Sequence, residues 1–134
     1  MAESETRQKG DDMSYPQMVY LVQKLYGRTD DGSVAWEETE IEGVFQAAFS
    51  EYAVRLSMQS PDGHVPGSED YVLSILNSRG LKIEEISDVD LAEDLVDSYE
   101  VMKHLYRAAR RKAMGVDQAL DSILSALGQE DISS

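Results

Sequence analysis

The chain contains 134 residues, 42% of them hydrophobic, and its 26 acidic and 12 basic residues give a formal net charge of −14 at pH 7. The hydrophobic share predicts a folded domain with a buried core, and the charge disfavours direct binding to nucleic acid or anionic lipid through long-range repulsion. The absence of cysteine excludes disulfide bonds, thiolate catalysis and cysteine-ligated metal centres.

Two short polar segments flank the predicted domain. Residues 1–13 and 128–134 show no apolar period, and we expect both to be disordered tails. No internal repeat or low-complexity segment divides the chain between them. Residues 14–127 are therefore predicted to form a single domain.

The first predicted element is a helix. Ser14 is a suitable N-cap, Pro16 fits the first helical turn, and Gly27 is a typical residue just beyond a helix end. Tyr20 and Leu21 lie outside the apolar stripe of this helix, so we predict that they belong to a partner-binding surface. The stripe recurs at helical spacing and consists of Tyr15, Met18, Val19, Val22, Leu25 and Tyr26.

The central part of the chain is predicted to form a sheet. Apolar and polar residues alternate with a period of two on both sides of Ser50-Glu51, which indicates a hairpin, although this pair is uncommon in two-residue turns and leaves the register open. The acidic residues 39–42 are predicted as an edge strand or a loop, and the proline- and glycine-rich residues 60–69 as a loop. The predicted strands cover residues 34–36, 45–49, 52–59, 70–76 and 81–86, and their short connections favour an antiparallel meander of four or five strands.

Two helices are predicted after the sheet. Either Ser87 or Asp90 is a suitable N-cap for a long helix that ends at Gly115, and Asp117 caps a second helix that ends at Gly128. The predicted fold class is therefore α+β, with an N-terminal helix, an antiparallel four- or five-stranded meander sheet and two C-terminal helices packed on one sheet face. The apolar stripe of the long helix is Leu95, Tyr99, Met102, Leu105, Tyr106, Ala109 and Ala113, and that of the second is Leu120, Ile123, Leu124 and Leu127.

The order of charges along the long helix is uneven. Residues 84–100 contain eight acidic residues and no basic one, whereas residues 101–115 contain five basic residues and no acidic one. One interpretation is complementarity to the helix macrodipole. The other is that the basic end docks on an acidic surface: a protein partner, nucleic-acid phosphate, or the acidic residues 29–54 of a second copy. The candidate partner-binding residues are Lys103, Arg107, Arg110 and Arg111.

Four large aromatic residues lie close together in the sequence: Trp36, Phe45, Phe49 and Tyr52. Their spacing favours the core face of the sheet. The alternative is a partly exposed groove for a peptide or a partner helix.

Catalytic and metal-binding patterns are weak. The two histidines are His64, in the predicted loop, and His104, off the apolar stripe of the long helix, where an exposed surface position is favoured over a catalytic base. Asp88 and Asp90 begin a pattern like a calcium-binding loop, but the later ligand positions do not match it. We therefore predict no catalytic residue, no metal site and no cofactor.

Several segments of the chain resemble a family of small, acidic, uncharacterised bacterial α+β proteins with no established activity. The resemblance covers about residues 34–127, implies the same fold and carries over no site residue; the similar segments are residues 36–39, 45–49, 52–56, 70–75 and 113–120. In size, charge and C-terminal helix the chain is also similar to type III secretion chaperones. Those proteins place a helix between the third and fourth strands, where this chain has residues 60–69.

The favoured hypothesis is a non-catalytic protein–protein interaction module, either an adaptor or accessory subunit or a chaperone-like protein. We expect a cytoplasmic homodimer that binds a protein partner through the sheet edge or an exposed helix face. No membrane partner is expected, because no apolar run approaches the roughly 20 residues of a membrane span. The second hypothesis is an acidic inhibitor that imitates nucleic acid and occupies a DNA-binding protein. The third is a hydrolase that uses His64 or the acidic cluster.

Overall fold

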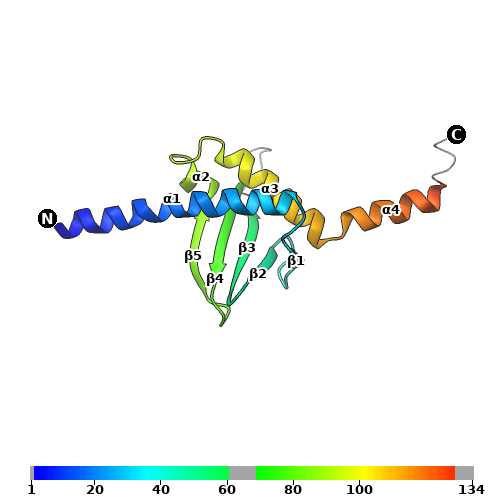
Figure 1. The fold of residues 1–134 in the computed structure, drawn as a ribbon, viewed down its shortest axis with the longest axis horizontal. Coiled ribbons are helices and arrows are strands. Elements are labelled where there is room, and N and C mark those ends of the chain that lie inside the picture. Colours follow the sequence, from blue (N-terminus) through cyan, green and yellow to red (C-terminus); the bar gives the residue numbers. More distant parts are fainter. Residues whose placement is uncertain (1, 61–68, 129–134) are drawn as a thin grey trace.

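The computed structural model describes the backbone of residues 2–60 and 69–128 and the side chains of residues 16–60 and 69–128. The predicted α+β class is confirmed: an N-terminal helix, an antiparallel sheet and C-terminal helices follow one another along the chain (Figure 1). The elements are α1 (Ala2–Asp30), β1 (Glu37–Glu38), β2 (Phe45–Phe49), β3 (Tyr52–Gln59), β4 (Asp70–Leu76), β5 (Lys82–Ser87), α2 (Asp88–Leu91), α3 (Ser98–Ala113) and α4 (Val116–Leu127).

The five strands form a meander in the order β1-β2-β3-β4-β5, and every neighbouring pair is antiparallel. α1 and α3 lie across one face of this sheet (Figure 1). The predicted period-two alternation places Phe45 and Ala47 of β2, Val54 and Leu56 of β3, and Tyr71 and Leu73 of β4 on that face, where they bury against the helices. The largest fully buried side chains of the core are Leu56, Leu73, Ile86, Leu91, Met102, Leu105 and Val22.

The hairpin register, which the sequence leaves open, is resolved by a two-residue turn. Phe49 pairs with Tyr52, and Ser50 occupies the left-handed region with φ of 60°. The predicted strand over residues 34–36 is wrong, because pairing with β2 involves only the next two residues, Glu37 and Glu38. Val34 and Trp36 are nevertheless buried, so their alternation reflects insertion into the core rather than a ladder.

α1 has different ends from the predicted helix. It continues through Gly27 to Asp30, and Pro16 lies inside it rather than in its first turn. The extension includes Thr29, which is buried. The bounds of α1 also include most of residues 1–13; the side chains of that segment lie outside the described residues, and its expected disorder stays a prediction, as does that of residues 129–134.

The predicted long helix is divided into α2 and α3. Ser87 is the N-cap of α2, and its capping box with Asp90 satisfies backbone donors at this helix start. The Ser98 hydroxyl donates to the backbone oxygen of Asp88 at 2.8 Å, and the Asp88 carboxylate accepts the Tyr71 backbone N–H at 2.8 Å. These buried contacts stabilise the turn between the two helices, which the helical period of the side chains did not predict.

This division changes the interpretation of the charge order. Most of the acidic residues 84–100 lie in β5, in α2 or in the connecting turn, and only Glu100 lies in the first turn of α3. The last turn of α3 carries Arg110, Arg111 and Lys112. The macrodipole therefore accounts for the basic end of α3 but not for the whole acidic run.

α4 extends away from the rest of the molecule (Figure 1). It follows Gly115, whose φ of 64° favours glycine, and none of its residues is buried. Its main contacts are with α3.

Candidate protein-binding surfaces

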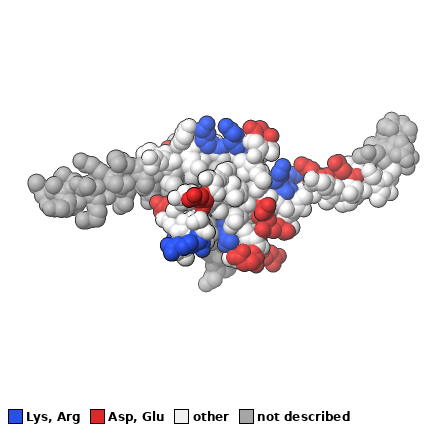
Figure 2. All heavy atoms as spheres, turned by 60° about the horizontal axis from the view of Figure 1, so that its bottom comes forward, with Lys and Arg blue, Asp and Glu red and all other residues white. Residues whose placement is uncertain are grey.

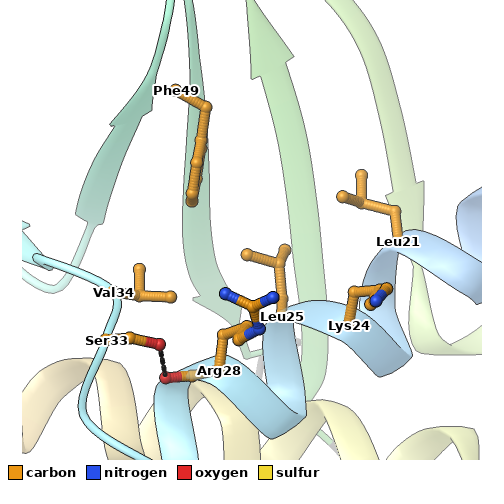
Figure 3. A pocket seen from close by; sticks show the side chains of 7 residues that line it. All are labelled: Leu21, Lys24, Leu25, Arg28, Ser33, Val34 and Phe49. Carbon is orange, nitrogen blue, oxygen red and sulfur yellow. Dashed lines mark hydrogen bonds between the residues drawn. The ribbon is translucent and has the colours of Figure 1, made fainter.

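An apolar groove lies between α1 and β2 on the helix-covered face of the sheet. Its volume is about 180 Å³. Figure 3 shows the ring of Phe49 pointing from β2 toward the apolar side chains of α1. We call this cavity the α1–β2 groove; it is lined by Leu21, Lys24, Leu25, Arg28, Ser33, Val34 and Phe49.

The groove exists because the helices do not cover the hairpin end of β2. Phe45 and Phe49 point to the same face, since they are four residues apart in a strand, yet Phe45 is 2% exposed and Phe49 is 41% exposed. Ala47 between them is buried and too small to fill the space. The four aromatic residues therefore divide: Trp36 and Phe45 belong to the core, whereas Phe49 and Tyr52 are exposed.

Tyr20 and Leu21, the two α1 residues predicted to bind a partner, have different surroundings. Leu21 is half-buried and lines the α1–β2 groove. Tyr20 is 62% exposed and lies outside the groove lining; the Lys24 ammonium group is 5.6 Å from the centre of its ring. The structure thus brings Leu21, but not Tyr20, together with Phe49.

The predicted basic residues of α3 lie on its outward side, and we call Lys103, Arg107, Arg110 and Arg111 the basic face. The Lys103 ammonium group is 5.6 Å from the ring centre of Tyr99. Arg107 and Arg111 line a hollow of about 420 Å³ beside the end of α1. In that hollow Arg111 Nη2 is 2.6 Å from Asp117 Oδ1, so part of the positive charge is already paired.

α4 presents an exposed apolar surface that the sequence analysis assigned to packing on the sheet. Leu120, Ile123 and Leu127 are 45–70% exposed, and Leu124 is half-buried. We call these four residues the α4 stripe. At about 100° per residue, Asp117 and Asp121 lie together along one flank of the stripe. Figure 2 shows α4 as an arm with acidic atoms along one side.

Of the two histidines, His104 lies in the described part of the chain. His104 is exposed, as predicted; its Nε2 is 3.4 Å from Asp30 Oδ1, and its ring stacks at 4.8 Å on Tyr26. His64 lies outside the described residues. Within residues 16–60 and 69–128 there is no group of three or more histidine, aspartate or glutamate side chains placed to hold a metal ion.

A pair of tyrosines, Tyr71 (buried) and Tyr99 (half-buried), lies at the end of the sheet opposite the β2–β3 hairpin. The hydroxyls of Tyr71 and Tyr99 both donate to Glu69 Oε2, at 3.4 Å and 3.1 Å. Burial, followed by the nearby Glu69 charge, raises the pKa of Tyr71 to about 12. Because this phenol stays protonated at neutral pH, its hydroxyl remains a hydrogen-bond donor to Glu69.

No family model, curated protein or solved structure matches this chain. The resemblance of residues 34–127 to a bacterial family therefore stays an expectation. Among the described residues, no helix has both the length and the apolar character needed to cross a membrane.

Proposed function

We propose that this protein is a non-catalytic protein–protein interaction module, working as an adaptor or accessory subunit. The observation that carries the proposal is the α4 stripe, a row of large aliphatic side chains on a helix that buries none of its residues. Full burial of one such side chain stabilises an association by about 1.5–3 kcal/mol. A protein partner that covers the stripe therefore gains affinity from several adjacent side chains.

The length of α4 supports the same conclusion. A helix of 12 residues is marginal in water on its own, because the cost of nucleation is offset by few hydrogen bonds. Helices of this kind are stabilised mainly by packing of their apolar face. Contact with a partner would supply that packing, as in other complexes in which an amphipathic helix lies in an apolar groove.

The basic face of α3 has a separate role in this proposal. Its exposed guanidinium groups attract an acidic protein surface, which accelerates and orients docking, while apolar side chains supply most of the affinity. The net charge of −14 opposes direct nucleic-acid binding, so the proposed partner is a protein.

A capture experiment tests the proposal. The tagged full chain, the variant Leu120→Glu/Ile123→Glu and the matched control Ser122→Glu/Ser125→Glu are expressed in the source cell, and co-purifying proteins are quantified by mass spectrometry. We expect the stripe variant to recover at least tenfold less of a specific partner than the wild type does; an untagged copy of this chain counts as such a partner. The control is expected to recover as much as the wild type. Equal partner recovery by all three proteins would overturn the proposal.

The basic face is tested in the same experiment. Arg107→Glu/Arg110→Glu avoids Arg111, which already forms an ion pair with Asp117 of α4. We expect this variant to lose partner at low salt and to differ less from the wild type at high salt, because exposed charges are screened. A loss that is independent of salt would argue against electrostatic docking.

A further inference from the structure

We propose that the α4 stripe of one copy occupies the α1–β2 groove of a second copy, and that the exchange is reciprocal. The inference rests on the proposed function, since it names the partner of the same apolar surface. Two such contacts related by a two-fold axis give a closed dimer in which every contact occurs twice.

The two surfaces are apolar and lie on different parts of the molecule. The floor of the α1–β2 groove consists of Leu21, Leu25, Val34 and Phe49. α4 points away from the body in Figure 1 and contacts mainly α3, so it leaves its own groove open. One copy thus carries both an unfilled apolar groove and an uncovered apolar helix, which is the combination that a reciprocal exchange requires.

The charges beside the two surfaces are complementary. Lys24 and Arg28 line the groove, which has no acidic lining residue. α4 carries Asp117 and Asp121 and no basic residue. A partner helix of this composition would bring its acidic flank to the basic side of the groove.

The spacing of these charges also agrees. Lys24 and Arg28 are four residues apart on α1, and Asp117 and Asp121 are four residues apart on α4. At 1.5 Å per residue, each pair spans about 6 Å along its helix. Two ion pairs per groove therefore form with the helices side by side, without a change in either backbone. In the single copy, Asp117 pairs with Arg111 across an exposed contact that solvent screens, so it is available for exchange.

The direction of α4 favours a second copy over the same chain. Gly115, with φ of 64°, sets the direction of α4, and no residue of α4 lines the groove of its own copy. Stable interfaces bury about 800 Å² on each partner. A reciprocal exchange doubles the buried area of a single contact, because two helices and two grooves take part.

Light scattering coupled to size-exclusion chromatography tests the exchange on the purified full chain over a range of concentrations. We expect a dimer for the wild type and for Ser122→Glu/Ser125→Glu, and a dissociation constant at least tenfold higher for Leu120→Glu/Ile123→Glu. Circular dichroism and thermal melts show whether each variant is folded.

A charge-reversal pair identifies the surfaces that meet. Lys24→Glu/Arg28→Glu makes the groove acidic, and Asp117→Lys/Asp121→Lys makes α4 basic, so each variant repels itself and is expected to be monomeric. Their mixture is expected to form a heterodimer, because the basic α4 fits the acidic groove and the unchanged α4 fits the unchanged groove. A wild-type monomer, as produced by α4 folding onto its own groove, or a mixture that stays monomeric would overturn the exchange.

The two proposals fail in distinguishable ways. If the wild type is monomeric but the stripe variant still loses a different captured protein, the exchange is wrong and the interaction function stands. If the chain is monomeric and the stripe variant captures the same proteins as the wild type, both proposals are wrong.

Discussion

Trp36 Nε1 donates a hydrogen bond to the Thr29 hydroxyl at 2.9 Å, and both side chains are buried. This bond joins the end of α1 to the segment that leads into β1. The intervening chain is held by the Ser33 backbone N–H, which donates to the oxygen of Arg28 at 2.9 Å. This backbone hydrogen bond between Ser33 and Arg28 positions Arg28 and Val34, which both line the α1–β2 groove.

Removal of the Thr29 hydroxyl should destabilise the fold. In Thr29→Val the indole N–H of Trp36 is left buried without an acceptor, and we expect a loss of about 1–3 kcal/mol in the free energy of unfolding by urea. Thr29→Ser keeps the hydroxyl acceptor, so we expect a smaller loss in its free energy of unfolding. A larger loss in Thr29→Ser than in Thr29→Val would show that the methyl group, rather than the hydrogen bond, is what matters.

The two phenylalanines of β2 should respond differently to truncation. Phe45→Ala removes a buried ring and is expected to cost about 3–5 kcal/mol in unfolding free energy, whereas Phe49→Ala at the groove is expected to cost at most about 1 kcal/mol under dilute conditions. In light scattering, Phe49→Ala should nevertheless weaken dimerisation. A folded Phe49→Ala protein with wild-type dimerisation would show that this ring is not part of the docking surface.

The cap of α2 is expected to contribute measurably to stability. Ser87→Ala removes the side-chain acceptor of the Asp90 backbone N–H and should lower the free energy of unfolding by about 1 kcal/mol. Ser122→Ala, on the exposed part of α4, is the control and is expected to have no measurable effect. An unchanged urea midpoint in Ser87→Ala would mean that α2 is stabilised by packing of Leu91 alone.

Asp88 should give stability an unusual pH dependence. Burial raises the pKa of this carboxyl in the folded state above its ordinary value of 3.8, despite the opposing hydrogen bond from the Tyr71 backbone. The folded state therefore binds more protons than the unfolded state just above pH 3.8, so the contribution of Asp88 to stability falls as pH rises through this window.

The variant Asp88→Asn tests this sign. Its side-chain oxygen retains an acceptor for Tyr71 and does not ionise in this range. The free energy of unfolding of the wild type minus that of Asp88→Asn should therefore decrease between pH 3 and pH 7. An increase over that range would mean that the hydrogen bond, rather than burial, determines the pKa.

The order of strands was predictable because it depends on local patterns. Period-two alternation places Phe45, Leu56 and Leu73 on one face, and short connections make neighbouring strands antiparallel. The Ser50 turn was not predictable from residue preference, because the pairing of whole strands overrides the cost of one left-handed residue. The break between α2 and α3 was missed for a related reason: it depends on the long-range contact of Asp88 with β4.

The sequence specifies less about the candidate binding surfaces than about the helices and strands. The α4 stripe and the basic residues of α3 follow directly from helical period and charge, and both were identified from the printed sequence. The exposure of these residues was not predictable from the sequence, because the spacing of an apolar stripe is the same whether or not another element covers it. Phe45 and Phe49 share one face and one chemistry, but the Phe45 ring packs against Tyr106 of α3, whereas Phe49 lies at the open α1–β2 groove. Burial is a property of packing between distant segments, and the tertiary structure alone determined it here.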